Sequence, residues 1–224
     1  MEISPIAYAY NGFTEKFGIP RQSGCAPSVL TRIVFEPEFR MAEAFRGIEQ
    51  WSHLWLIWGF SGNEGWSPTV RPPRLGGNTR VGVFATRSPF RPNGLGLSSV
   101  RLEKVDNGSD GLVLVVSGAD LMNGTPVFDV KPYLPYTDIH PDAASGFVTC
   151  NNGYRLQVVW EKDAGIDMPD SIVTQLCEIL SEDPRPAYKK DGDGQEYGLS
   201  YAGWNVMFTV AEGTLYVKKT KKVK

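Results

Sequence analysis

The sequence contains few of the residues that build metal centres and disulfide frameworks. It has two histidines, His53 and His140, and three widely separated cysteines, Cys25, Cys150 and Cys177, among 224 residues. Two histidines do not suggest a histidine-rich metal site. No pair of cysteines has the spacing of a zinc finger or a redox motif, and an odd number does not suit a secreted disulfide framework. The sequence therefore predicts neither a metal site nor a disulfide.

Long hydrophobic runs are also missing. The longest strongly apolar run covers residues 53–60, far short of the roughly 20 residues that a transmembrane helix needs. Residues 1–10 lack the basic start and apolar core of a secretory signal. Because 42% hydrophobic and 21% charged residues are typical of globular proteins, we expect a soluble cytoplasmic protein without a membrane partner.

Acidic residues are absent from residues 65–102, which contain six arginines and therefore carry a local charge of +6 in a chain whose net charge is −2. A solvated surface usually mixes charges of both signs. Guanidinium groups bind phosphate and carboxylate through two donors at once. The segment therefore predicts an anion-binding surface, with surface arginines on a proline-rich loop as the alternative.

Short apolar or alternating runs dominate the first two thirds of the chain and predict strands. Glycine, proline, asparagine or aspartate separates them, and one helix is expected over residues 37–45. The expected strands cover residues 3–10, 29–35, 54–60, 81–85, 97–105 and 112–118. The order indicates a closed or nearly closed barrel and not a doubly wound fold.

The composition changes after residue 145. Apolar residues with a period of 3.6 predict a helix beginning near Asp170 and ending before Pro184, and two strands are expected on either side of Glu212-Gly213. The basic residues 218–224 are expected to be mobile. We therefore predict a mainly β protein, with a β-barrel domain over residues 1–145 and a small α+β domain over residues 146–224.

Two further patterns leave alternatives open. Gly94-x-Gly96 lacks the third glycine of a dinucleotide-binding loop and precedes an expected strand, so a turn into a barrel strand is favoured. Val127, Asp129, Lys131 and Tyr133 would share one face of a strand. The three polar residues among them form either a structural ion pair with a tyrosine beside it or the polar wall of a pocket.

Several long motifs resemble one known family. They are "RPPRLGGNTRVGVFATRSPFRPNGLG", "DLMNGTPVFDVKPYLP" and "DPRPAY", supported by "PRQ" at residues 20–22 and "GIEQWSHLWLIW" at residues 47–58. The chain resembles the TsaA-like family of tRNA adenine N6-methyltransferases over essentially its whole length. This resemblance implies a homodimeric β-barrel enzyme that uses S-adenosylmethionine without a Rossmann loop. The implied substrate is tRNA with N6-threonylcarbamoyladenosine beside the anticodon, which is methylated on N6.

The resemblance also implies roles for individual positions. Cofactor-binding residues are expected to be Pro20, Arg21, Gln22, Phe60, Ser61, Arg87, Leu97, Leu121, Met122, Asn123, Gly124 and Thr125. RNA-binding residues are expected to be Arg71, Arg74, Arg80, Arg91, Arg185 and Tyr188. The family commonly has "RPNPIG" where this chain has "RPNGLG", which loosens a turn. It has "DGTP" where this chain has Asn123-Gly124-Thr125-Pro126, which removes a carboxylate.

The expected chemistry needs a group that removes the N6 proton. We predict Asp129 as the base, with Lys131 or Tyr133 orienting it or stabilising charge. Arg87 is expected to bind either the carboxylate of the cofactor or the RNA. The competing classes are a non-catalytic RNA-binding barrel and a methyltransferase for another small molecule or nucleoside. A hydrolase is disfavoured because no nucleophile motif is present.

Overall fold

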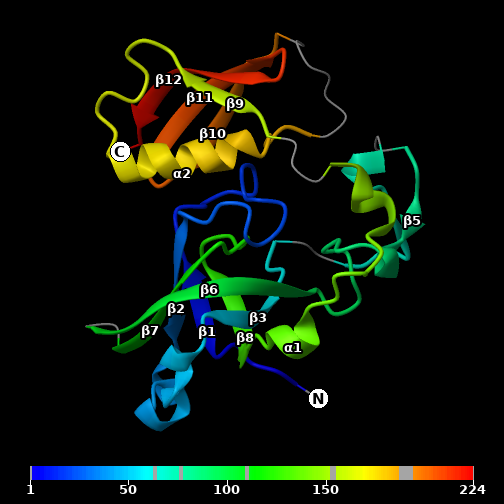
Figure 1. Ribbon diagram of the computed structural model, residues 1–224, viewed down its shortest axis with the longest axis vertical. Helices are drawn as coiled ribbons and strands as arrows, with labels where there is room; N and C mark the ends of the chain where they lie inside the picture. The colour runs from blue at the N-terminus through cyan, green and yellow to red at the C-terminus, as the bar shows by residue number, and fades with distance from the viewer. Residues whose placement is uncertain are drawn as a thin grey trace.

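A computed structural model describes residues 2–62, 65–75, 78–108, 111–151, 155–186 and 194–223. Six antiparallel strands form a closed barrel in the N-terminal part of the chain, with the order β1-β2-β7-β6-β3-β8 (Figure 1). These strands are β1 (Ala7–Tyr10), β2 (Leu30–Phe35), β3 (His53–Gly59), β6 (Leu95–Gly108), β7 (Gly111–Ser117) and β8 (Thr125–Pro132). Pairing of β1 with both β2 and β8 closes the barrel.

The barrel closes around alternating apolar side chains. In β3, Leu54, Leu56 and Trp58 point inward and are buried, while His53 is exposed and Trp55 is half-buried. Successive strand residues point to opposite faces, so this alternation places one set of side chains in the core. The closed sheet leaves no unpaired edge, which is the physical advantage of a barrel over an open sheet.

A second layer lies above the barrel in Figure 1. It is a four-stranded sheet with the order β10-β11-β12-β9, in which β9 runs parallel to β12. Its elements are β9 (Gln157–Trp160), α2 (Asp170–Ser181), β10 (Tyr197–Tyr201), β11 (Trp204–Ala211) and β12 (Thr214–Lys222). Helix α2 buries Leu176, Ile179 and Leu180 in the core of this domain.

The segment between β1 and β2, residues 11–29, joins the two cores. Phe13, Ala26 and Val29 belong to the same apolar cluster as α2 and the second sheet. The backbone N–H and hydroxyl of Ser28 both donate to the Glu178 carboxylate, at 2.8 and 2.7 Å. The chain therefore leaves the barrel after β1, packs under α2 and returns as β2 (Figure 1).

The remaining elements are short. The hairpin β4 (Thr69–Val70) and β5 (Val81–Gly82) stands apart from the barrel, and α1 (Pro135–Asp138) follows β8. Six 3-10 helices cover Pro37–Phe39, Ala42–Phe45, Ile48–Gln50, Pro73–Leu75, Val83–Ala85 and Gly146–Asn151.

The structure confirms the predicted fold class, and five of the six strands expected in the barrel are barrel strands with shifted ends. The strand expected over residues 3–10 begins only at Ala7. The prediction of a barrel strand over residues 81–85 is wrong, because Val81–Gly82 pairs with β4 outside the barrel and Val83–Ala85 is a 3-10 helix. Gly94-x-Gly96 leads into β6 and not into a helix, as predicted. The glycine at position 96 is required by packing, because a Cβ there would lie 2.3 Å from the Trp58 ring.

Two further local predictions are wrong. Residues 37–45 form two 3-10 helices separated at Arg40-Met41, because Phe45 is the one side chain they bury and an α-helix needs a longer apolar stripe to hold it. The basic residues 218–222 are not a mobile tail. They belong to β12 and pair with β11, where Lys222 stands opposite Trp204.

Candidate functional site

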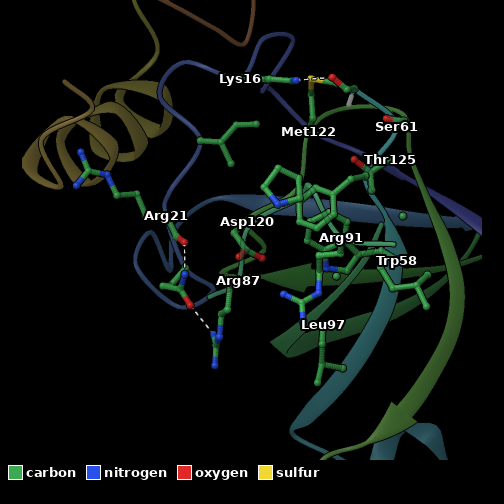
Figure 2. Close-up of a pocket in the computed structure, with 18 of the residues that line it drawn as sticks. Lys16, Arg21, Trp58, Ser61, Arg87, Arg91, Leu97, Asp120, Met122 and Thr125 are labelled. Atoms are coloured by element: carbon green, nitrogen blue, oxygen red, sulfur yellow. Dashed lines mark hydrogen bonds between the residues drawn. The ribbon is translucent and has the colours of Figure 1, made fainter. Parts of the chain in front are cut away.

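A cavity of about 550 Å³ lies at one end of the barrel. Four chain segments line it: residues 16–22 before β2, residues 55–62 at the end of β3, residues 86–97 before and in β6, and residues 120–125 between β7 and β8. Figure 2 shows side chains from all four segments converging on this space. The cavity therefore depends on the barrel for its base and on loops for its walls.

A hydrogen-bonded chain of three side chains forms the polar part of the base. The indole N–H of Trp58 donates to the Ser98 hydroxyl at 2.9 Å. The same hydroxyl donates to the Asp120 carboxylate at 2.5 Å. Because Ser98 has a single hydroxyl proton and accepts from Trp58, its proton is directed to Asp120.

The pKa of the Asp120 carboxyl group, which lines the cavity, is shifted by its surroundings. Burial raises its pKa above the ordinary value of an aspartate, and this effect outweighs hydrogen bonds from Ser98 and the Ser23 backbone and the attraction of Arg87. Burial disfavours the charged form of a carboxyl group. Perturbed acids of this kind are common where proteins do chemistry.

One wall of the cavity is held from the C-terminal domain. The Arg21 guanidinium donates to the backbone carbonyls of Asp183 and Arg185, at 3.1 and 2.6 Å. The side chain of Gln22 donates to the Arg21 carbonyl and accepts from the Arg87 guanidinium (Figure 2). Arg21 thus forms part of the cavity wall, while its guanidinium group points away from the cavity.

The structure places Arg185 in the interior and not on an RNA-facing surface. Its side chain is 2% exposed, and its guanidinium pairs with the Asp183 carboxylate at 2.8 Å. The expectation of a phosphate contact fails here because the guanidinium is covered and already paired. Tyr188, predicted beside it, lies outside the described residues.

The other predicted RNA-binding arginines differ in exposure. Arg71 and Arg80 are exposed on the β4–β5 hairpin, where Arg80 also donates to Thr69 at 2.8 and 3.0 Å. Arg91 is half-buried and donates to the carbonyls of Val83 and Thr86, which braces the loop before β6. The backbone of Arg74 lies in the 3-10 helix Pro73–Leu75, and its side chain is outside the described part of the structure.

Most of the predicted cofactor-binding residues come together. Nine of them line the cavity: Pro20, Arg21, Gln22, Phe60, Ser61, Arg87, Leu97, Met122 and Thr125. Leu121, Asn123 and Gly124 do not line it, and they fix the loop instead. Leu121 is buried in the barrel core, the Asn123 side chain accepts from the Asn11 backbone at 3.0 Å, and Gly124 has a φ of +81°. Either Asn or the Asp expected at position 123 supplies that acceptor oxygen.

The three predicted catalytic residues lie outside the cavity lining. A bulge in β8 at Phe128 separates Val127, which faces the core beside Trp58, from Asp129, which pairs with Ile57 on the outer face. The four residues expected on one face are therefore divided between two faces. Asp129 is 43% exposed and pairs with Lys131 at 2.8 Å. This contact matches the structural ion pair among the alternatives considered from the sequence.

Tyr133 does not line the cavity, but its ring packs against a residue that does. Its ring lies 5.4 Å from the ring of Trp55, which lines the cavity, and 6.2 Å from that of His53. The indole N–H of Trp55 donates to the Asp138 carboxylate at 2.7 Å, and this contact and the backbone N–H of Leu134 hold the pKa of Asp138 below its usual range. Tyr133 and Asp138 thus support a cavity wall from outside.

Sequence reasoning missed Asp120, Ser98 and Trp58 as members of one site. Asp120 lies three residues after the end of the buried strand β7 and precedes the Asn123-Gly124 turn. An acid between an apolar strand and a turn was the available signal. No sequence spacing links it to Ser98 and Trp58, because antiparallel pairing of β3 and β6 brings those two together.

The residues that the structure describes form neither a metal-binding cluster nor a membrane-spanning helix. Within these residues, no group of three or more histidine, cysteine, aspartate or glutamate side chains could hold a metal ion. Within the same residues, no helix is long and apolar enough to cross a membrane.

The fold and the cavity together define a β-barrel protein with a candidate ligand site that is bordered by arginines. The chain belongs to the TrmO family: the model of the tRNA-methyltransferase O N-terminal domain matches residues 8–139, and that of the TrmO C-terminal domain matches residues 154–223.

Individual relatives cover nearly the whole chain. The tRNA (adenine(37)-N6)-methyltransferase of Escherichia coli is 42% identical over 217 residues, 93% of this chain and 91% of that protein. A putative S-adenosylmethionine-dependent methyltransferase of Pseudomonas aeruginosa is 42% identical over 206 residues, 88% of this chain and 87% of that protein. A crystal structure of TrmO from Pseudomonas aeruginosa has a TM-score of 0.81 at 33% identity and covers 99% of this chain and 97% of that one.

Proposed function

We propose that this protein transfers a methyl group from S-adenosylmethionine to N6 of adenine 37 in tRNA. The observation that carries the proposal is the cavity at the end of a closed barrel, bordered by an arginine-rich segment, in a chain of the TrmO family. The finer proposal is that the adenine carries an N6-threonylcarbamoyl group. Its carboxylate and the RNA phosphates give the arginines of residues 65–102 an anionic target.

The residues of the cavity fit S-adenosylmethionine. Its volume of about 550 Å³ lies in the range of roughly 300–1,000 Å³ that is usual for small-molecule sites. Trp58, Phe60 and Leu97 offer apolar surface, and Arg87 suits the cofactor carboxylate. When bound, the cofactor supplies an electrophilic methyl group on a positively charged sulfur.

The protein's own contribution is orientation. The walls at residues 20–22 and 86–91 are fixed by hydrogen bonds to carbonyls and to each other. Holding two reactants in line can lower a barrier by about 7–11 kcal/mol in the best cases. Such rigid walls suit a reaction in which the cofactor already provides the electrophile.

Exposed arginines on the β4–β5 hairpin support contact with RNA. Arg71 and Arg80 are exposed in the segment of residues 65–102 that lacks acidic side chains. A chain with a net charge of −2 binds RNA through such a local patch. Phosphate contacts of this kind bring the RNA to the cavity without reading its sequence.

We further propose a homodimer in the cytoplasm. Large apolar side chains are exposed along the same segment, with Phe84 73% and Trp66 57% exposed. Leu97, which lines the cavity, is also exposed. Exposed apolar groups that cluster in this way are typical of protein interfaces. Light scattering should give twice the mass of one chain, and a single-chain mass would contradict the dimer.

Methyl transfer from labelled S-adenosylmethionine to two tRNA pools tests the function. One pool carries threonylcarbamoyladenosine, and the other comes from cells that cannot make it. Label in the first pool alone is the expected result. Label in both pools would keep the methyltransferase and reject the threonylcarbamoyl requirement. Tight tRNA binding without label, beside an active control enzyme, would favour a non-catalytic RNA-binding barrel.

A further inference from the structure

Asp120 supplies the carboxylate of the cavity. The charged residues among its described lining are Lys16, Arg21, Arg87 and Arg91, which are cationic, and Asp120. Arg21, Lys16 and Arg91 donate to backbone carbonyls: Arg21 to Asp183 and Arg185, Lys16 to Gly62, and Arg91 to Val83 and Thr86. Arg87 donates to Gln22 and attracts Asp120 at longer range. In the described part of the chain, no cation forms a salt bridge with Asp120.

The Asp120 carboxylate is held in one orientation. Its Oδ1 accepts the Ser98 hydroxyl proton, and Ser98 is in turn fixed by the Trp58 indole N–H. Trp58 is itself locked in the barrel, because the Gly96 backbone passes so closely that a Cβ there would meet its ring. These contacts arrive from β3 and from β6.

We propose that Asp120 is the proton acceptor of the methyl transfer, and this inference rests on the proposed function. The N6 nitrogen of a carbamoylated adenine carries a proton that must leave when a fourth bond forms. The nitrogen forms its bond to the methyl carbon, and the electron pair of the broken carbon–sulfur bond remains on sulfur. The N6 proton passes to the Asp120 carboxylate and from there to solvent, so charge and atoms balance.

Asp129, the base expected from the sequence, is less suited to this task. It lies on the outer face of the barrel, pairs with Lys131 at 2.8 Å and accepts from the Val130 backbone N–H at 2.9 Å. The Asp129 carboxylate is thus held by its own neighbours on the surface of the barrel and does not face the cavity. Asp120 lines the cavity directly, whereas Asp129 does not.

The test compares Asp120→Asn with Asp129→Asn and with Asp106→Asn as the matched control. Asp106 is exposed on β6 and pairs with Lys104 at 2.9 Å, away from the cavity lining. In the full-length protein, with tRNA carrying threonylcarbamoyladenosine, Asp120→Asn should lower kcat by about 100-fold or more. Asp106→Asn should leave kcat unchanged. A larger loss in Asp129→Asn than in Asp120→Asn would overturn the assignment.

The kcat–pH profile of Ser98→Ala distinguishes a proton acceptor at Asp120 from a residue with a purely structural role. The Ser98 hydrogen bond lowers the pKa of Asp120, so its removal should raise that pKa further. The acid limb of the kcat–pH profile should then move to higher pH. The midpoint of the pH titration of the Asp120 carbon-13 carboxyl resonance, measured in the cofactor-free protein, should also move to higher pH. An acid limb that stays in place would overturn the assignment.

Calorimetry separates a base from a counter-charge. A proton acceptor predicts that Asp120→Asn binds S-adenosylmethionine and S-adenosylhomocysteine with the same affinity ratio as the unchanged protein. A selective loss for the positively charged S-adenosylmethionine would make Asp120 a counter-charge and overturn the proposal. If the unchanged protein methylates no tRNA while both ligands bind, the proposed function fails first and the assignment falls with it.

Discussion

Two arginine-bearing regions meet at the same cavity wall and use their charge in different ways. The segment of residues 65–102 carries six arginines and no acid, and Arg71 and Arg80 are exposed there. The C-terminal domain contributes Arg185, which is 2% exposed and paired with Asp183. Between them, Gln22 accepts from Arg87 and its neighbour Arg21 donates to the Asp183 and Arg185 carbonyls.

The difference shows that an arginine in a basic motif is not by itself a ligand contact. Arg185 belongs to a motif with an acid two residues earlier, and the two side chains neutralise each other in the interior. Residues 65–102 have no internal acid, so Arg80 and Arg91 donate to carbonyl and hydroxyl oxygens and Arg71 is exposed. Arg101, at the end of the segment, pairs with Glu103 just outside it. A nearby carboxylate decides whether a guanidinium remains available to an external anion.

The strongest test of the comparison is Arg185→Ala. Removing one partner of a buried ion pair leaves an uncompensated charge, so the free energy of unfolding should fall by about 3 kcal/mol. Urea denaturation measures this loss. Arg155→Ala is the matched control, because Arg155 pairs with Glu182 at 2.7 Å but is 48% exposed, and its loss should stay below about 1 kcal/mol. Equal losses in the two variants would remove the distinction between the regions.

The cavity arginine is tested by Arg87→Ala. If Arg87 binds the cofactor carboxylate, calorimetry should show about a tenfold or greater loss of S-adenosylmethionine affinity, since hydrogen bonds to charged groups contribute about 1.5–3 kcal/mol. Arg101→Ala, exposed on β6 beside Glu103, serves as the control. Unchanged cofactor affinity with weaker tRNA binding would instead make Arg87 an RNA contact.

The exposed region is tested by Arg71→Ala. Because Arg71 is exposed, its loss should leave the free energy of unfolding unchanged and weaken tRNA binding. The slope of log K against log salt should become shallower by about one unit for one lost phosphate contact. Binding titrations at several salt concentrations measure this slope. A slope identical to that of the unchanged protein would exclude Arg71 as a phosphate contact.

The smallest effect is expected from Asp120, the acid that lines the cavity, and it concerns the pH dependence of stability. The pKa of Asp120 is raised in the folded protein, so the folded state binds its proton more tightly than the unfolded chain. Its contribution to stability is therefore greatest at low pH and declines as pH rises from about 4 through the raised pKa. Asp120→Asn should flatten this decline in Tm measured across pH. A variant with the same pH dependence as the unchanged protein would contradict the burial of the charged carboxylate.

The barrel could be predicted from the sequence because strand alternation is local. Residues 54–60 and 112–118 already carried the apolar pattern that β3 and β7 bury. The bulge at Phe128 could not be read in this way, and it moved Asp129 to the outer face. A one-residue bulge moves every later side chain of the strand to the opposite face of the sheet, and the sequence of the strand does not indicate where a bulge occurs.

The candidate site was predicted only where motifs are contiguous. Pro20, Arg21, Gln22, Arg87 and Leu97, predicted together from long motifs, line one cavity. The chain from Trp58 through Ser98 to Asp120 was missed because three separate elements supply it. Arg185 was misassigned because burial depends on tertiary packing and not on the charge of the residue.

The segment between β1 and β2 has a consequence for biosynthesis. It leaves the barrel before the second strand and is covered by α2 and the last sheet, while its residues 20–22 form a cavity wall. During translation the barrel strands emerge from the ribosome well before α2 and β12. In the nascent chain this wall therefore lacks its support until α2 and β12 have been synthesised. The hydrogen bonds from Arg21 to the Asp183 and Arg185 carbonyls are thus among the last contacts of the cavity wall to form.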